Sequence, residues 1–443
     1  MNRRIGALLL ALLLASGGPA LAESAPGAEA AAAAEEAARE TANAEPGAAG
    51  EKAGEAAAAP ETAAREARTK AADISEHCTF NNKAGGPRHM LNDGAYNRVF
   101  ETGPRNGVHS VEIRVTEGEP MGALYIQWAG DPGPAAVQVP DGEDWVTVAT
   151  TDGSFFADYI PIPECTVCRV TGLNSPRTQL RISELRVLTA GTPPENIQVW
   201  RKPEGKVDMI LLSGHPDDEL LWFGGILPTY AGVRKKQVQV CILVPTLPRR
   251  RLEELDGLWT CGVRNYPVFG NFRDFFTLSL SDQYERWDKE RVYKTVTGWI
   301  RRFKPDVVIT HDLKGEYGHG AHRACADAVI QALADAPNAK KYRESYREYG
   351  GWKVPKVYIH LYPESVIQFD WRIPLEEFGG MTAFEVAEAA FECHVSQRDT
   401  EYTVEDSGPC DCSLFGLYRS LVGPDTEHRD LFENLDSLVA DED

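Results

Sequence analysis

Two parts of the chain differ in the spacing of their hydrophobic residues. Up to about residue 190, short runs alternate between apolar and polar residues, and Gly, Pro, Asn and Asp separate the runs at short intervals. This pattern is typical of strands joined by turns in an all-β sandwich. The predicted strands are residues 109–115, 123–128, 145–149, 166–170 and 180–188.

After residue 203 the period changes. Residues 207–213 form a continuous apolar run that suits a buried parallel strand, and a helical pattern over 219–230 and a strand over 238–244 follow it. Strands that alternate with helices predict an α/β domain with a Rossmann-like, mostly parallel sheet and flanking helices. No Gly-x-Gly-x-x-Gly follows the first strand, so nothing supports dinucleotide binding. Further strands are predicted at 306–310 and 356–360, and further helices at 252–261, 288–303 and 322–333.

The chain begins with the order of residues found in a secretory signal. Arg3 and Arg4 precede an apolar run over residues 5–15, and small residues follow up to Ala22. We therefore expect a secreted or extracytoplasmic protein that starts near Glu23 and has no transmembrane segment after signal removal. The predicted regions are a signal peptide at 1–22, an Ala/Glu-rich disordered tether at 23–71, the β-sandwich at 72–195, the α/β domain at 204–425 and an acidic tail at 426–443.

The net charge limits the possible partners of the chain, and its cysteine content limits the possible disulfides and zinc sites. The chain has 46 basic and 66 acidic residues, a net charge of −20, which argues against nucleic acid or an anionic membrane as partner. Nine cysteines in an exported chain permit disulfides, and the odd number leaves at least one unpaired. Cys165 and Cys168 do not make a zinc ribbon with Cys410 and Cys412, because the second pair lacks the usual two-residue gap and lies in another predicted domain.

Residues suited to catalysis follow two of the predicted parallel strands. His215, Asp217 and Asp218 come after residues 207–213, and ligands gather beyond the carboxyl ends of strands in open α/β sheets. His319 and His322 follow the strand at 306–310, and their i, i+3 spacing places both on one side of a helix. Two histidines and a carboxylate around one open position form a known pattern for catalytic zinc. Taken singly, such residues also decorate helix surfaces or cap helices, but their joint position favours one site.

These motifs resemble a known family. The run His215-Pro216-Asp217-Asp218-Glu219, with Gly318-His319-Gly320-Ala321-His322 downstream, is similar to the PIG-L/LmbE-like zinc-dependent N-acetylglucosaminyl de-N-acetylase family. The resemblance spans about residues 207–422. Further similarity lies in Arg250, Glu253 and residues 261–263, 394–397 and 415–420.

The resemblance implies a zinc-dependent N-deacetylase, that is, an amide hydrolase that removes acetyl from a sugar amide. Carried over by position, it makes His215, Asp218 and His322 the metal ligands. It makes Asp217 the general base, and His319 the residue that stabilises or protonates the tetrahedral intermediate. A carboxylate beside a metal that activates water agrees with this division of roles.

Five further residues are candidates for orienting ligands or contacting substrate. His311 and Asp312 could orient the metal ligands or only cap a loop. Arg250 could hold a substrate hydroxyl or phosphate, although a surface position within its run of three arginines is the simpler expectation. His394 could reach the site or be a core histidine, the latter being favoured, and Tyr317 could gate the entrance.

The β-sandwich region also resembles a known group. Its Leu91-Asn92-Asp93-Gly94 turn and the closing residues 180–187 are similar to discoidin-like (coagulation-factor type C) jelly-roll domains, many of which bind glycans. Phe100 stands where such domains often carry Trp, which is a departure from the pattern. Four aromatic residues could stack on sugars or, as is commoner on strands, fill the core; these are Tyr125, Trp128, Trp145 and Tyr159.

Together these features predict a zinc-dependent hydrolase whose substrate is an N-acetylated amino sugar in an extracytoplasmic glycan or glycoconjugate. Another divalent metal would fit the same ligand types. Two alternatives remain open. One is the same chemistry on a different acyl amide, and the other is a non-catalytic adhesive protein that binds a glycan through its β domain.

Overall fold

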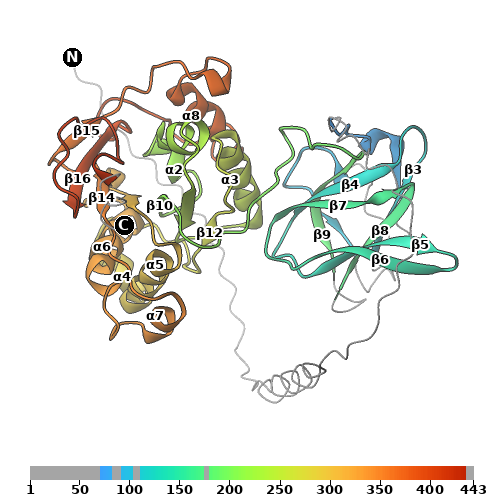
Figure 1. Ribbon diagram of the computed structural model, residues 1–443, viewed down its shortest axis with the longest axis horizontal. Helices are drawn as coiled ribbons and strands as arrows, with labels where there is room; N and C mark the ends of the chain where they lie inside the picture. The colour runs from blue at the N-terminus through green and yellow to red at the C-terminus, as the bar shows by residue number, and fades with distance from the viewer. Residues whose placement is uncertain (1–69, 82–90, 103–109, 174–178, 436–443) are drawn as a thin grey trace, which may run out of the picture. The chain divides into compact units, whose positions relative to one another are not determined.

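The computed structural model describes residues 70–81, 91–102, 110–173 and 179–435, in which an all-β part precedes an α/β part (Figure 1). The predicted signal peptide, and the tether up to residue 69, lie outside these described residues. Within the same ranges, no helix combines the length and the apolar character needed to span a bilayer.

The all-β part consists of two antiparallel sheets, as predicted. One sheet has the strand order β1-β3-β8-β5-β6 and the other β2-β9-β4-β7. Every second residue of β3 is buried, and Val111 and Ile113 share a core with Leu124 and Ile126 of β4. The strands are β1 (Cys78–Asn81), β2 (Phe100–Glu101), β3 (Ser110–Val115), β4 (Met121–Trp128), β5 (Ala135–Asp141), β6 (Asp144–Thr151), β7 (Ala157–Cys165), β8 (Val167–Gly172) and β9 (Arg181–Leu188).

Four of these strands, β1, β2, β5 and β7, were not predicted, and proline interrupts the patterns of two of them. β5 contains Pro140, and β7 contains Pro161 and Pro163. β7 lies at the edge of its sheet, where a residue without a backbone donor is tolerated.

The aromatic residues of the sandwich divide between core and surface. Tyr125 and Trp128 are each only 2% exposed, and the Trp128 indole N–H donates to Asp158 at 2.7 Å, so both belong to the interior. Trp145 and Tyr159 are half-buried, and the Arg169 guanidinium lies 4.4 Å from the Trp145 ring centre. Of the four candidates for sugar stacking, only Trp145 and Tyr159 therefore keep an accessible ring.

The α/β part is built on a seven-stranded sheet with the order β12-β11-β10-β13-β14-β16-β15. The first five strands in this order, β12, β11, β10, β13 and β14, pair in parallel. β16 is antiparallel to both β14 and β15. The sheet is thus mostly parallel, as predicted, with an antiparallel edge whose two strands the pattern did not reveal. The strands are β10 (Met209–Ser213), β11 (Val238–Ile242), β12 (Val268–Phe269), β13 (Val307–Thr310), β14 (Lys356–His360), β15 (Val366–Gln368) and β16 (Leu414–Ser420).

Helices cover both faces of this sheet, which explains the continuous apolar run of β10. Met209 and Leu211 pack in one core with residues of α2, α3 and α8, and Ile210 and Leu212 pack in a second core with α5 and α6. Both faces are therefore apolar, as in other parallel sheets. The helices are α2 (Asp218–Leu221), α3 (Pro248–Thr260), α4 (Leu280–Arg286), α5 (Lys289–Phe303), α6 (Gly320–Asp335), α7 (Arg343–Tyr349) and α8 (Ala383–Phe391).

The helix predicted over 219–230 is wrong in its length. α2 ends at Leu221, and a separate π-helical turn spans Pro228–Val233. Between them, Gly224 has a positive φ of 47°, and a Cβ at Gly225 would lie 2.6 Å from the Trp371 ring. The close approach of Trp371 requires glycine here, and this pair of glycines interrupts the helix.

All nine cysteines lie in the described ranges, and all nine are free thiols in this structure. The permitted disulfides are therefore not formed, including those within the two closely spaced pairs. Most of these thiols are buried, where they act as small apolar side chains.

A buried ion pair joins β14 to the segment that follows the sheet. Lys356 Nζ donates to Asp425 Oδ1 at 2.5 Å and to the Glu433 carbonyl oxygen at 2.9 Å, and Tyr358 Oη donates to Asp425 Oδ2 at 2.5 Å. Both charged side chains are fully buried. Leu431 is also fully buried, so packed structure extends beyond residue 426, where the acidic tail was predicted to begin.

Removing one partner of this pair should destabilise the fold strongly. Asp425→Ala leaves the Lys356 ammonium buried without a counter-charge, and we expect it to lower the free energy of unfolding by about 3–5 kcal/mol. Urea unfolding followed by circular dichroism measures the change. The matched control is Asp406→Ala, which removes the exposed Arg372–Asp406 pair and should cost at most about 1 kcal/mol. Equal losses for the two variants would contradict a structural role for the buried pair.

Candidate active site

The loop after β10 brings three of the predicted site residues together. The His215 backbone N–H donates to Asp218 Oδ2 at 2.7 Å, and His215 Nδ1 lies 3.2 Å from the same oxygen. The chain can approach this closely because residue 214 is glycine. A Cβ there would lie 3.1 Å from Asp218 Oδ2 and 3.2 Å from His322 Cδ2.

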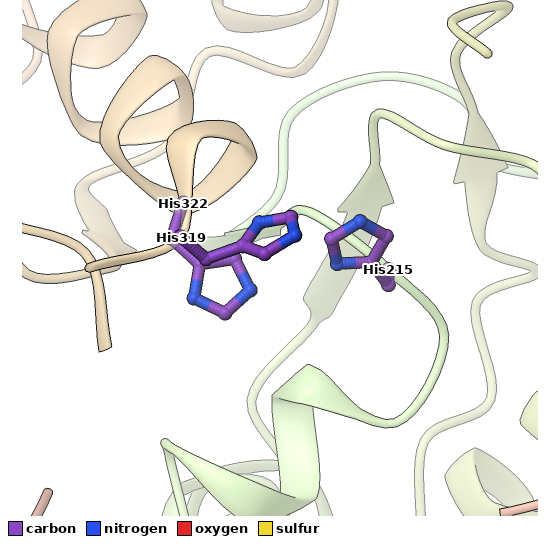
Figure 2. A group of neighbouring side chains, drawn as sticks. All are labelled: His215, His319 and His322. Carbon is purple, nitrogen blue, oxygen red and sulfur yellow. The ribbon is translucent and has the colours of Figure 1, made fainter. Parts of the chain in front are cut away.

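The start of α6 supplies two histidines to the same place. β10 and β13 are neighbouring parallel strands, so the loops at their carboxyl ends converge, as the sequence predicted. Figure 2 shows the rings of His215, His319 and His322 turned toward the same space, with the latter two at the first turn of the helix. His322 Nε2 lies 3.3 Å from Asp218 Oδ1. All four side chains are buried or nearly so.

A single buried carboxylate, Glu316, orients the histidines behind the site. It accepts hydrogen bonds from Nδ1 of His311 at 2.8 Å, His322 at 2.8 Å and His360 at 2.6 Å. Burial alone would raise the pKa of Glu316, but His311 and the other two imidazoles hold this pKa well below its usual range. Because His322 donates from Nδ1, its Nε2 carries the lone pair. That atom is buried and has no hydrogen-bond partner among the described residues.

Hydrogen bonds also determine which atoms near His322 can bind a metal. His311 Nε2 accepts from the Gly214 N–H at 3.0 Å, and His319 Nδ1 accepts from the Ala321 N–H at 3.3 Å. The lone pairs of those two ring atoms are therefore occupied. His322 Nε2, which lies 3.3 Å from Asp218 Oδ1, has no hydrogen-bond partner among the described residues and keeps an acceptor position for a metal.

Buried residues that could bind a metal form two overlapping groups here, whose ligand atoms all lie within 4.8 Å of one another: one is His215, His319 and His322, and the other is Asp218, His311 and His322. Two ligands bound at about 2.0–2.1 Å to a tetrahedral zinc lie about 3.3 Å apart. The His215–Asp218 and His322–Asp218 separations of 3.2 and 3.3 Å agree with that spacing. Burial alone would raise the pKa of Asp218, but His322 and His215 hold this pKa well below its usual range, so the carboxylate is ionised and suited to a cation.

Asp217 is held beside this set in a strained conformation. Its φ is +108°, which is rare for a residue other than glycine and is typical of functional sites. Its backbone N–H donates to Glu219 Oε2 at 3.0 Å, and Arg250 Nη2 donates to Asp217 Oδ2 at 2.8 Å and to the Pro216 carbonyl oxygen. Burial, opposed by Arg250, raises the pKa of Asp217 to about 6.

Arg250 corrects one expectation from the sequence. We expected a surface position for this arginine, but its side chain is largely buried and contacts Asp217 and the turn before it. It therefore belongs to the site.

The other candidates lie at different distances from the cluster. His311 is fully buried behind Asp218, and the Asp312 backbone N–H donates to Glu316 Oε1 at 3.1 Å. The Tyr317 ring is 40% exposed, and its centre lies 5.5 Å from that of His322. His394 is fully buried between Glu219 and Glu254, at 3.7 and 3.8 Å, and so is a core histidine rather than a residue of the open site.

Several residues of the site were not found from the sequence. Glu316 and His360 were not predicted as site residues, because only the fold brings three histidines into contact with one carboxylate. Asp274 Oδ1 lies 3.4 Å from His215 Nε2, and Phe276 is 71% exposed with its ring centre 5.5 Å from that of His319. Both follow β12, whose two residues are too short a run to be recognised as a strand.

Two cavities adjoin the cluster. One of about 570 Å³ is lined by Trp222, Tyr317, Tyr402 and neighbouring residues, and the Tyr317 and Tyr402 rings stack with their centres 5.0 Å apart. The other, of about 720 Å³, is lined by Arg250 and Asp274 among others. Both cavities are thus lined by residues that contact the cluster, Arg250 and Asp274 in one and Trp222 and Tyr317 in the other.

The chain was compared with known families and proteins. The sequence profile described as PIG-L, GlcNAc-PI de-N-acetylase, matches residues 210–333. A relative named 1D-myo-inositol 2-acetamido-2-deoxy-alpha-D-glucopyranoside deacetylase 1, from Frankia casuarinae, is 24% identical over 254 residues, which are 50% of this chain and 78% of the relative. A deacetylase with the same name, but without the number, from Rhodococcus erythropolis is 25% identical over 266 residues, covering 49% of this chain and 87% of that protein.

Solved structures resemble each part of the chain. The N,N'-diacetylchitobiose deacetylase of Pyrococcus horikoshii is 18% identical, with a TM-score of 0.34, and the match covers 43% of this chain and 70% of that one. The family 32 carbohydrate-binding module of NanJ from C. perfringens, in complex with galactose, is 16% identical, with a TM-score of 0.22, and the match covers 27% of this chain and 98% of that one.

The family profile covers β10, the loop after it and the start of α6, which are the elements that bring together His215, Asp217, Asp218, His319 and His322. The α/β domain of this chain is thus similar to the PIG-L de-N-acetylase family over residues 210–333.

Proposed function

We propose that the chain is a zinc-dependent hydrolase that removes the N-acetyl group from an N-acetylated amino sugar of an extracytoplasmic glycan or glycoconjugate. The observation that carries this proposal is the cluster of buried histidine and aspartate side chains, in which the hydrogen bond to Glu316 leaves His322 Nε2 free beside Asp218. The acetamido sugar follows the names of the family profile and of the two relatives. The extracytoplasmic location follows the signal-like first residues.

When bound by these residues, zinc would polarise the amide carbonyl and activate water as a nucleophile. Asp217 accepts the proton from that water. Arg250 already donates to Oδ2 of Asp217, which leaves Oδ1 to take the proton. The strained backbone at this residue is fixed by the hydrogen bonds with Glu219 and Arg250, which restrict the movement of the carboxylate.

His319 supports the other side of the reaction. Burial and the neighbouring His322 and His215 lower the pKa of His319 to about 3, and its Nδ1 accepts a backbone hydrogen bond, so the ring is neutral and carries its hydrogen on Nε2. This N–H donates to the oxyanion that develops on the substrate carbonyl. One such donor is typically worth about 2.7–4 kcal/mol of transition-state stabilisation.

Exposed aromatic rings flank the entrance to the cluster. Phe276 packs against His319, and Tyr317 packs against His322 from the opposite cavity. Aromatic faces of this kind suit the apolar face of a sugar ring. They support a sugar amide as substrate over a small, flexible acyl amide.

The test is acetate release from N-acetylhexosamine substrates by the zinc-loaded full chain. Asp217→Asn keeps the shape of the side chain but removes the base, and we expect kcat to fall by about 10²–10⁴-fold with bound zinc unchanged. The control is Asp282→Asn, an exposed residue of α4 that should leave kcat unaltered. The proposal would be refuted if no acetate were released from any of these sugars, or if Asp217→Asn kept full activity.

Glu316 provides a second test through metal affinity. Glu316→Gln removes the charge that three imidazole N–H groups share, so we expect zinc affinity to fall by about 10–100-fold. Competition with a chromophoric chelator measures this affinity without reference to activity. Glu344→Gln, in an exposed pair with Lys294, is the matched control. Unchanged zinc affinity in Glu316→Gln would mean that His322 does not bind the metal.

A further inference from the structure

The larger of the two cavities beside the cluster is strongly basic, although the chain carries a net charge of −20. Four arginines line its volume of about 720 Å³, against two acidic residues, Asp274 and Asp288. An excess of positive charge in one cavity of an acidic protein concentrates the attraction for anions at that place. The four arginines are Arg250, Arg273, Arg286 and Arg291.

The cavity adjoins the proposed catalytic cluster through two of its lining residues. Asp274 lines the cavity, and its Oδ1 lies 3.4 Å from His215 Nε2. Arg250 lines the cavity as well and donates to Asp217. A molecule whose acetamido group lies at His215 and Asp217 can therefore extend directly into this basic space.

Two of the arginines have no anionic partner in the described part of the chain. The guanidinium carbons of Arg273 and Arg286 each lie 5.4 Å from the centre of the Phe275 ring. Cation–π contact holds both groups on one aromatic ring without using their N–H donors. In the described ranges, neither guanidinium makes a hydrogen bond or an ion pair.

The acidic residues of the cavity do not neutralise this pair. Asp288 is the N-cap of α5, and its Oδ1 accepts from the Arg291 backbone N–H at 3.1 Å. Asp274 is directed to His215, with its Oδ1 3.4 Å from His215 Nε2. Arg291 is also engaged, since it donates to the Asn271 carbonyl oxygen. Arg273 and Arg286 are thus the two cations left free to receive a ligand.

We propose that this cavity is an anion subsite in which Arg273 and Arg286 bind an oxyacid group, a phosphate or a carboxylate, carried by the substrate beside its acetamido sugar. The inference rests on the proposed function and specifies its substrate class as an anionic rather than a neutral amino-sugar derivative. Planar guanidinium groups suit this ligand, because each presents paired N–H donors to two oxygens of one oxyacid.

The experiment compares matched sugars on the zinc-loaded full chain. The probes are N-acetylglucosamine, which is neutral, N-acetylglucosamine 6-phosphate, which carries a phosphate, and N-acetylmuramic acid, which carries a carboxylate. Calorimetric Kd and kcat/KM for acetate release are measured separately at low salt. We expect at least one anionic probe to bind ten-fold or more tightly than the neutral sugar, and this preference to shrink as salt screens the pair. Which probe gains shows whether phosphate or carboxylate is the natural group.

The matched variants assign the preference to its residues. In the double variant Arg273→Ala/Arg286→Ala, the ratio of anionic to neutral affinity should fall to within two-fold of one. The control Arg347→Ala, an exposed arginine of α7, should leave that ratio unchanged. The subsite is refuted if the wild-type chain binds all three sugars equally, or if the preference survives in the double variant.

Separate measurements of binding and of acetate release distinguish a failure of the anion subsite from a failure of the deacetylase proposal. Acetate release from the neutral sugar without any preference for anions would uphold the deacetylase and overturn the subsite. Arginine-dependent binding of an anionic probe without acetate release from any sugar would uphold the subsite and overturn the deacetylase.

Discussion

The site depends on how the fold stabilises buried carboxylates. Glu316 and Asp218 lie a few residues from the ends of neighbouring strands, almost without contact with solvent. Each ionised carboxylate in such a place needs hydrogen-bond donors, or its desolvation would outweigh the packing around it. Glu316 obtains three imidazole donors, and Asp218 obtains the Trp222 indole at 3.0 Å and the His215 backbone N–H. The same donors fix the ring orientations on which metal binding depends.

This arrangement separates the histidines into two groups. His311 and His360 complete the hydrogen bonding of Glu316 and have no free lone pair directed at the cluster, since His311 accepts from Gly214 and His360 Nε2 lies 2.9 Å from the Asp411 carbonyl oxygen. His322 shares the same carboxylate but faces the other way, toward Asp218. Hydrogen-bond geometry thereby distinguishes the histidines that only support Glu316 from His322, which also faces the proposed metal site.

The limits of the sequence pattern follow from particular residues. The order of β10, β11, β13 and β14, and the convergence of the two motif loops, were predictable because each strand is a continuous apolar run before a polar turn. Glu316 was not, because its partners His311, His322 and His360 come from three separate segments. Asp274 follows a two-residue strand without a period, and Arg250 sits in an arginine run that looks like a solvated surface. The broken helix after β10 depends on Trp371, more than 140 residues away in sequence.

The buried lysine of β14 bears on the order in which the chain can fold. Lys356 is in the middle of the sheet by position, yet its counter-ion Asp425 and its second acceptor Glu433 come about 70 and 77 residues later. Until those residues are available, docking β14 against β13 would place an ammonium group in an apolar interior. The Lys356–Asp425 pair therefore links the burial of β14 to the position of the 425–433 segment. The charge pair forms only when the whole domain is present.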